Sequence, residues 1–184
     1  MNVLVLSSSD KVYAAVTQLL RLLGGHKAFR ATTPRQAKVL AGQMDIGAAV
    51  VHADGADAEY RDICLRLAED CVGTVFVPYR GDGVDELYAS GVFVAEKPIT
   101  KATLFTAMRG ALGVAYGYEK LRRENAKLKA RLEELRIISR AKCMLASGGM
   151  TEEQAHREIE RRAMNERRTK TDIAKEIIEG NTSE

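Results

Sequence analysis

Short apolar runs alternate with amphipathic segments over the first 112 residues. Val3–Leu6, Ala48–Val51, Val75–Val77 and Val92–Val94 are continuous apolar runs. Because these runs lack the alternation of a strand with one solvated face, they predict strands buried on both faces, as in a parallel sheet covered by helices. We therefore predict a doubly wound α/β domain with a five-stranded parallel sheet over residues 1–112.

Helical periodicity fills the segments between these runs. Apolar residues of Val12–Leu23 recur on one helical face, and Gly24-Gly25 follows as an end signal. This face consists of Val12, Ala15, Val16, Leu19, Leu20 and Leu23. A second helix is expected to begin near Pro34. Further helices are predicted at Asp57–Asp70, Val84–Ala89 and Lys101–Leu112.

From Val114 the pattern changes to a long helical segment without proline. Leucines repeat every seven residues, and the positions between them complete a heptad seam, which predicts a short coiled-coil linker over residues 113–139. The d positions are Leu121, Leu128 and Leu135, and the a positions are Tyr118, Asn125, Leu132 and Ser139. We expect a homodimer through Leu121, Asn125, Leu128, Leu132 and Leu135. An asparagine at an a position favours parallel helices in register. Alternatively, the leucines pack on the α/β domain of the same chain.

Residues 140–184 predict a compact head of three short helices. The first continues the long helix to about Ser147 and ends at Gly148-Gly149. The second opens with the capping box Thr151-Glu-Glu-Gln154. Its inward residues are Ala155, Ile159, Ala163 and Met164. The third begins near Thr169–Thr171 and ends at Gly180. Its inward residues are Ile173, Ala174, Ile177 and Ile178.

Composition excludes several classes of protein. The 184 residues are 46% apolar and 29% charged, a balance typical of soluble proteins. No apolar run approaches the ~20 residues that span a bilayer, and the N-terminus lacks the features of a signal peptide, so we expect a cytoplasmic protein without a membrane segment. Cys64, Cys71 and Cys143 lack metal-type spacing. We expect them to be small buried residues without disulfides.

The net charge of +3 comes from the C-terminal third of the chain. Residues 1–118 contain 12 Lys/Arg and 12 Asp/Glu, whereas residues 119–184 contain 16 and 13. A basic excess confined to one segment is weak support for a nucleic-acid partner, because mixed charges also keep helical surfaces solvated.

The α/β part resembles the receiver domains of response regulators in its strand order and in Glu96-Lys97-Pro98. Working receivers phosphorylate an aspartate, using Mg²⁺ held by acidic side chains. Here the positions of the acidic pair hold Ser7 and Ser8, and the position of the acceptor holds His52. The fourth strand ends in Val77-Pro78-Tyr79, and only Lys97 is retained.

These substitutions predict a degenerate phosphorylation site at Ser7, Ser8, His52 and Lys97 that uses no metal or other cofactor. Hydroxyl groups are poor ligands for a hard divalent cation compared with carboxylates. The domain would then act by docking. Two alternatives stay open at this point: Asp10 or Asp54 could replace the lost acids in a shifted register, and His52 could be a phosphohistidine or a pH-sensing group rather than a structural residue.

The C-terminal head resembles the ANTAR family of antiterminators over about residues 127–181. The similarity rests on the order and spacing of four short motifs. These are Ile138-Ser-Arg-Ala141-Lys142-Cys-Met144-Leu145, Gln154-Ala155, Ala163-Met164 and Asp172-Ile-Ala174. The chain departs from the family at Cys143, where glycine is usual, at the reversed apolar pair Met144-Leu145, and at Gln154.

This resemblance implies an RNA-binding protein. ANTAR proteins bind tandem stem-loops in leader mRNA and prevent formation of a terminator hairpin, so the implied function is transcription antitermination by a dimer. Phosphate-rich hairpins call for basic side chains on neighbouring turns. The candidate RNA-binding residues are Arg140, Lys142, Arg167, Arg168, Lys170 and Thr171. No aromatic residue follows Tyr118, which argues against base-stacking platforms.

The degenerate receiver also resembles the amidase-operon subgroup of these antiterminators, in which the receiver docks a separate ligand-sensing protein. Two other classes compete with this interpretation. A DNA-binding response regulator would share the receiver and the dimeric linker but needs a recognition helix, and a protein-binding module would use the head without nucleic acid. An enzyme is not expected, because the sequence has no nucleophile–base pair, metal cluster or phosphate-binding glycine loop.

Overall fold

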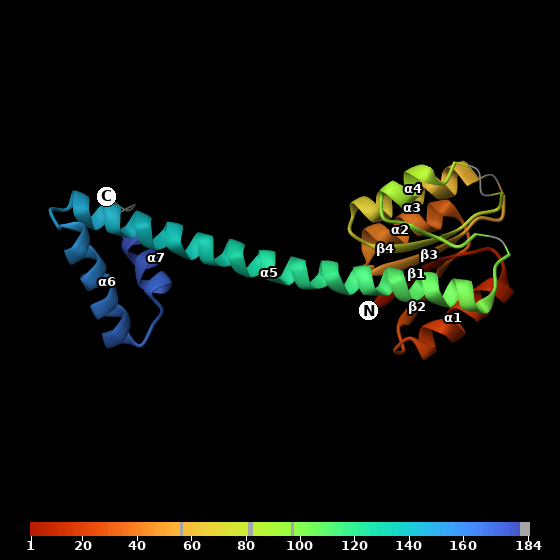
Figure 1. Ribbon diagram of the computed structural model, residues 1–184. Coiled ribbons are helices and arrows are strands. Elements are labelled where there is room, and N and C mark those ends of the chain that lie inside the picture. Colours follow the sequence, from red (N-terminus) through yellow and green to blue (C-terminus); the bar gives the residue numbers. More distant parts are fainter. Residues whose placement is uncertain (56, 81–82, 97, 181–184) are drawn as a thin grey trace. The chain divides into compact units, whose positions relative to one another are not determined.

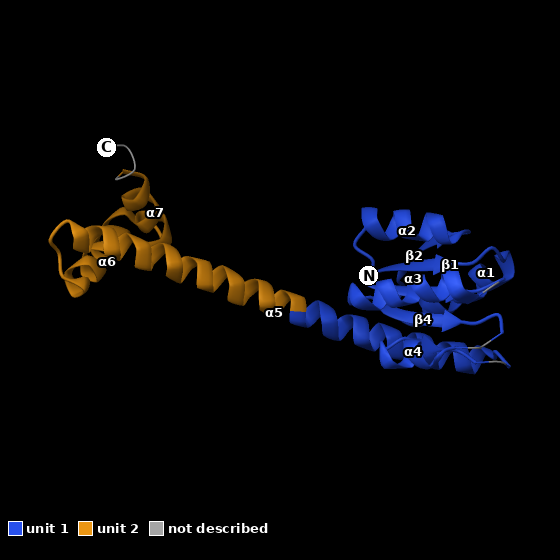
Figure 2. Cartoon of the chain, turned by 90° about the horizontal axis from the view of Figure 1, so that it is seen from above, with its two compact units in different colours: residues 1–121 blue, residues 122–184 orange. Residues whose placement is uncertain are grey.

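The computed structural model describes residues 1–55, 57–80, 83–96 and 98–180. The chain forms two compact units, Met1–Leu121 and Arg122–Glu184 (Figure 2). Among the described helices, none has both the length and the apolar character that crossing a bilayer requires.

The first unit is a doubly wound α/β fold, as predicted (Figure 1). Its sheet has the strand order β2-β1-β3-β4-β5, and every neighbouring pair is parallel. The strands are β1 (Asn2–Leu6), β2 (Lys27–Ala31), β3 (Ala48–His52), β4 (Gly73–Val77) and β5 (Phe93–Val94). The helices are α1 (Asp10–Leu22), α2 (Pro34–Gln43), α3 (Asp57–Glu69), α4 (Asp85–Ala89) and the start of α5 (Lys101–Ser147).

Alternate residues of each strand enter different cores, one on each face of the sheet. Leu4 and Leu6 of β1 pack with α2, α3 and α4, whereas Val3 and Val5 pack with α1 and α5. Figure 1 shows these two helix layers on opposite sides of the sheet. Burial on both faces explains why the strands read as continuous apolar runs.

Helix α5 lies directly against the start of β4. A Cβ atom on Gly73 would be 2.0 Å from the carbonyl oxygen of Ala111, so only glycine permits this approach of the two backbones. Ala111 is itself buried, and its small side chain fits the same contact. This contact holds α5 against the face of the sheet formed in part by β1 and β3, the strands that end at the degenerate site.

Strand β2 was not located by the apolar pattern. Its sequence, Lys-Ala-Phe-Arg-Ala, has only Ala31 buried, because β2 is the edge strand next to β1. The helix predictions were closer, although Ala15, expected on the inner face of α1, is exposed. The cysteine expectation was right for Cys64 alone, since Cys71 and Cys143 are exposed, and all three thiols are free.

The predicted helix at Lys101–Leu112 and the long helix after Val114 are one continuous helix, α5. It ends at Ser147 as predicted, and Gly149 follows with φ +97°, a left-handed conformation that favours glycine. Gly110, Gly113 and Gly117 lie inside this helix without ending it. Tertiary packing of the neighbouring turns, at Met108, Leu112 and Ala115, offsets their weak helix propensity.

In the second unit, the end of α5 packs with α6 (Glu152–Glu166) and α7 (Lys170–Gly180). The predicted capping box is present: the Thr151 hydroxyl accepts from the Gln154 N–H, and the Gln154 side chain accepts from the Thr151 N–H. The core consists of Ala141, Ile159, Ala163, Ile173 and Ala174. Ile177 and Ile178 are half-buried against it. Met164, expected to face inward, is 80% exposed.

Candidate functional site

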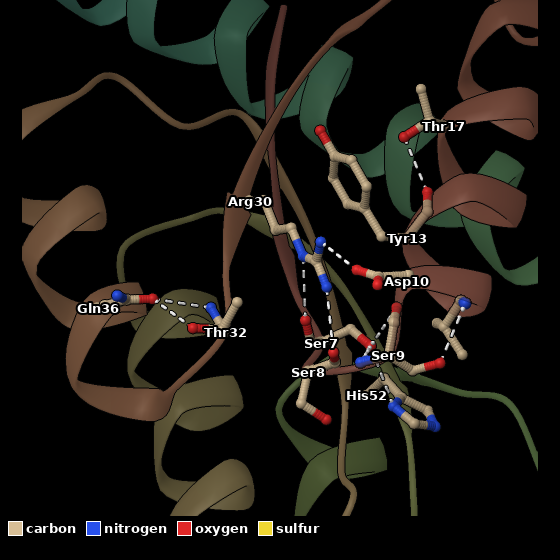
Figure 3. A network of polar contacts seen from close by, with 11 residues as sticks. Ser7, Ser8, Ser9, Asp10, Tyr13, Thr17, Arg30, Thr32, Gln36 and His52 are labelled. Carbon is tan, nitrogen blue, oxygen red and sulfur yellow. Dashed lines mark hydrogen bonds and ion pairs between the residues drawn. The ribbon is translucent and has the colours of Figure 1, made fainter.

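At the carboxyl edge of the sheet, the predicted residues Ser7 and His52 lie together. Ser7 is fully buried, and its Oγ lies 3.3 Å from His52 Nδ1 (Figure 3). The same Oγ accepts the backbone N–H of Ser9 at 3.2 Å. Its hydroxyl is therefore used within the protein, at a position where a working receiver would present a carboxylate to a metal ion.

Arg30 of β2 stabilises the loop that follows β1. Its guanidinium donates to the carbonyl oxygens of Ser7 at 3.4 Å and Ser8 at 3.1 Å, and pairs with Asp10 at 2.6 Å. The guanidinium also lies over the ring of Tyr13, 5.0 Å from its centroid, as Figure 3 shows. Asp10 therefore has an internal cation as its partner. Sequence reasoning missed Arg30, because a lone arginine on an edge strand gives no motif.

Asp54, the other acid near the degenerate site, accepts hydrogen bonds from the hydroxyls of Ser8 and Tyr60. The bond from Ser8, followed by the bond from Tyr60, lowers the pKa of the Asp54 carboxyl. Burial and the bond to Asp54 raise the pKa of Tyr60 to about 12. These bonds stabilise an ionised Asp54 by protein hydroxyls and tie the loops after β1 and β3 together.

Asp57, the first residue of α3, connects the next pair of loops. Its two carboxylate oxygens accept the backbone N–H groups of Tyr79 at 2.8 Å and Arg80 at 3.1 Å, just after β4. An internal carboxylate thus satisfies two consecutive donors at the sheet edge. Side chains of the protein itself thus link the loops that follow β1, β3 and β4. Lys97, the fourth residue of the predicted degenerate site, lies outside the described residues.

Incubation with a small phosphoryl donor and Mg²⁺ should leave the mass and the oligomeric state of the protein unchanged. Ser7 and Ser8 offer no carboxylate for the metal ion, and Asp10 and Asp54 already have internal partners. Intact-mass spectrometry with acetyl phosphate measures this outcome. A phosphorylated species that disappears in Asp54→Asn would instead establish the shifted register.

In the second unit, the predicted RNA-binding residues lie on three consecutive helical segments. Arg140 and Lys142 lie on α5, two residues apart. Arg167 is the C-cap of α6 with φ 52°, a left-handed conformation, so the chain turns sharply there. Lys170 and Thr171 begin α7, and Thr171 is half-buried.

Three of these basic side chains pair with acids of the same unit. Lys142 Nζ lies 2.8 Å from Glu152 Oε1. Arg168 pairs with Glu166 at 3.0 Å and Glu176 at 2.5 Å. Glu166 is two residues from Arg168, but Glu176 and Glu152 lie eight and ten residues from their partners on different helical segments, so spacing alone could not reveal these pairs.

Lys170 pairs with Glu160, whose carboxylate also lies 3.3 Å from His156 Nε2. Lys142 lowers the pKa of Glu152, and Lys170 lowers the pKa of Glu160. Arg140 and Arg167, in contrast, are exposed and have no ion pair within the described residues.

The predicted seam of α5 is exposed in the single chain. Leu121, Leu128, Leu132 and Leu135 are 62%, 63%, 57% and 57% exposed. Asn125, the polar a position between them, is also exposed. Large apolar side chains at regular helical spacing are typical of a helix face that another helix covers.

Comparison with protein families identifies an ANTAR domain at residues 126–178. This match covers the end of α5, all of α6 and most of α7. A search of curated proteins found no match.

Several solved structures share the fold. The response regulator StyR covers 97% of this chain and 98% of its own, with a TM-score of 0.65 at 14% identity. The signal receiver domain of an HD domain-containing protein from Pseudomonas fluorescens Pf-5 covers 65% of this chain and 91% of its own, with a TM-score of 0.52 at 19% identity. A two-component transcriptional regulator AraC from Clostridium phytofermentans ISDg covers 66% and 98%, with a TM-score of 0.51 at 16% identity.

These findings bear out the receiver-like fold and the ANTAR resemblance, which were both predicted from the residues. The sheet order β2-β1-β3-β4-β5 belongs to the first unit, and the ANTAR match belongs to the helices that follow it. The chain therefore combines a receiver-like fold with a segment at residues 126–178 that matches the ANTAR domain.

Proposed function

We propose that the protein binds stem-loops in leader mRNA as a dimer and acts in transcription antitermination. The observation that carries this proposal is the ANTAR match at residues 126–178, which includes most of the exposed basic side chains of the head. RNA hairpins combine a dense array of phosphates with unstacked loop bases, and basic side chains on short helices can contact both. The candidate contact residues are Arg140, Lys142, Arg167, Arg168, Lys170 and Thr171.

The proposed dimer forms through the exposed leucines of α5, with Asn125 setting a parallel register. Two heads held by one parallel coiled coil fit two stem-loops on one transcript, because the second hairpin then binds at a high effective concentration. The separate affinity of each head can therefore be modest. The boundaries at residues 112 and 139 remain our proposal for where receiver, linker and head begin and end.

For the first unit we propose regulation by protein docking rather than by phosphorylation. Arg30, Asp54 and Asp57 connect the loops at the sheet edge through hydrogen bonds of their own side chains. A loop arrangement held by internal bonds gives a partner a constant surface. A ligand-sensing regulatory protein is the proposed partner, by analogy with the amidase-operon antiterminators.

RNA binding can be tested by titrating the protein into a synthetic RNA of two stem-loops and into a duplex DNA of equal charge, over a range of salt. We expect preference for RNA and a loss of that preference in Lys142→Ala/Arg168→Ala. Each lysine or arginine that contacts a phosphate contributes about 1 to the slope of log affinity against log salt, so the slope should fall by about 2.

The matched control is Arg157→Ala/Arg161→Ala, which removes the same charge from α6. Both arginines form short-range pairs within α6, with Glu153 and Glu158, and belong to none of the predicted contacts. Circular dichroism verifies that both variants keep their helices. Equal weak binding to RNA and DNA, unchanged in either variant, would contradict the proposed function and favour a protein partner for the head.

A further inference from the structure

Five charged or titratable side chains form a row across the three helices of the head, named here the α6 charge row. Its members are Lys142 of α5, Glu152, His156 and Glu160 of α6, and Lys170 of α7. The three α6 residues are spaced four apart and so lie along one side of the helix. The lysines close the row at its two ends, each through an ion pair with a glutamate.

The lysines of the row are placed to contact a polyanion at two points. Glu152 and Glu160, which hold them, are eight residues apart, or roughly 12 Å along the axis of α6. One strand of nucleic acid rises about 3.4 Å per nucleotide, so the row is about as long as four stacked nucleotides. Sequence reasoning named both lysines but could not show that one side of α6 connects them.

The charges of the two lysines and the two glutamates in the row cancel, because each lysine has a carboxylate beside it. Both glutamates are ionised at neutral pH, since the adjacent lysines lower the pKa of each carboxyl. Glu152 is 81% exposed and Glu160 is 39% exposed, while their partners Lys142 and Lys170 are 22% and 47% exposed. Water reaches the carboxylate of each pair, and ion pairs at a protein surface contribute little to stability.

We infer that the two α6 glutamates of this row are internal competitors of RNA phosphates, and that bound RNA displaces them from the two lysines. This inference rests on the proposed RNA-binding function and adds a means of selectivity. A single phosphate displaces only one carboxylate, so its net contribution to the binding free energy is small. An RNA that presents phosphates to both ends of the row displaces both carboxylates at once, so rigid structured hairpins are favoured over loose polyanions.

Replacing the competitors by neutral isosteres should therefore tighten binding. We expect Glu152→Gln and Glu160→Gln each to increase the affinity for a synthetic two-stem-loop RNA by about threefold to tenfold at ~0.1 M salt, with a smaller gain at high salt. The gain for an unstructured single-stranded RNA of equal length should be larger, because the requirement for two simultaneous contacts is relaxed. Fluorescence anisotropy with the full chain measures both affinities.

Glu158→Gln is the matched control. It makes the same charge change two residues from Glu160, on the opposite flank of α6, where Glu158 is held by Arg161 and Arg162. A general effect of net charge would tighten binding equally in this control and would overturn the inference. A second test is the Lys170→Met background, in which Glu160→Gln should lose its gain, because the lysine that the carboxylate occupies is absent.

Failure of the inference differs from failure of the proposed function. If Lys142→Ala and Lys170→Ala weaken RNA binding but the two glutamine variants behave as the control does, RNA binding stands and the competition is wrong. If the wild-type protein shows no preference for the stem-loop RNA over duplex DNA, both the inference and the proposed function are wrong. If the glutamine variants lower the melting temperature of the head without tightening binding, the row is a set of structural ion pairs and the inference is overturned.

Discussion

We expect Leu128→Asp to convert the proposed dimer to a monomer. Leu128 is 63% exposed in the single chain and sits in the middle of the predicted seam, so the substitution removes two apolar side chains from the dimer and places two carboxylates there. Burying a leucine contributes about 1.5–3 kcal/mol, so the loss of two raises the dissociation constant by roughly a hundredfold or more. Analytical ultracentrifugation over a range of concentrations measures this constant. RNA with two stem-loops should then bind no more tightly than RNA with one.

Ala130→Asp is the control for Leu128→Asp. Ala130 is exposed two residues further along α5 and lies outside the heptad seam, so it introduces the same charge without touching the interface. This variant should remain dimeric. A wild-type protein that is monomeric, together with a lowered melting temperature of the α/β unit in Leu128→Asp, would favour the alternative in which the leucines pack within one chain.

The fold was predictable where the burial of an element requires a recognisable run of apolar residues. The strands β1, β3 and β4 are central and buried on both faces, so each is a continuous apolar run. The edge strand β2 has one row of backbone groups unpaired and mostly half-buried side chains, so its sequence resembles a loop. The continuity of α5 was missed for a related reason: its glycines suggest an interruption, while the packing that overrides them is long-range.

The sites were predictable only in part, because motifs report residue types and not partners. Ser7 and His52 were identified by the acids they replace, and the structure brings them within 3.3 Å of each other. Arg30 and Asp57, which hold the loops around them, belong to no motif and are visible only through contacts over 22 or 23 positions in the chain.

The same limit applies to the head. Its basic residues were found by family spacing and local charge. The glutamates that neutralise Lys142 and Lys170 each lie ten residues away in sequence, on a different helix. Sequence therefore predicts the cations of a binding surface but not whether they are held by internal acids in the free protein.

Ile159→Ala should unfold the head while leaving the α/β unit folded. Ile159 is 1% exposed at the centre of a core whose other buried members are three alanines and Ile173. Truncating a buried isoleucine costs about 2–5 kcal/mol, which is comparable to the whole stability expected of so small a core. Hydrogen exchange followed by mass spectrometry should show loss of protection in α6 and α7 and unchanged protection in the strands. Met164→Ala, on the same helix but at a position 80% exposed, should change stability by less than about 0.5 kcal/mol.

The Ile159→Ala variant also tests whether RNA binding depends on the charge of the head or on its folded structure, because the variant retains every basic residue of the head. A flexible basic segment still attracts polyanions through counterion release, so weak and salt-sensitive binding should persist for RNA and DNA alike. The preference for stem-loop RNA should vanish, since it depends on side chains from α5, α6 and α7 being held in one geometry. Retention of that preference in a head shown by hydrogen exchange to be unfolded would contradict recognition by the folded head and would place specificity in a short linear segment.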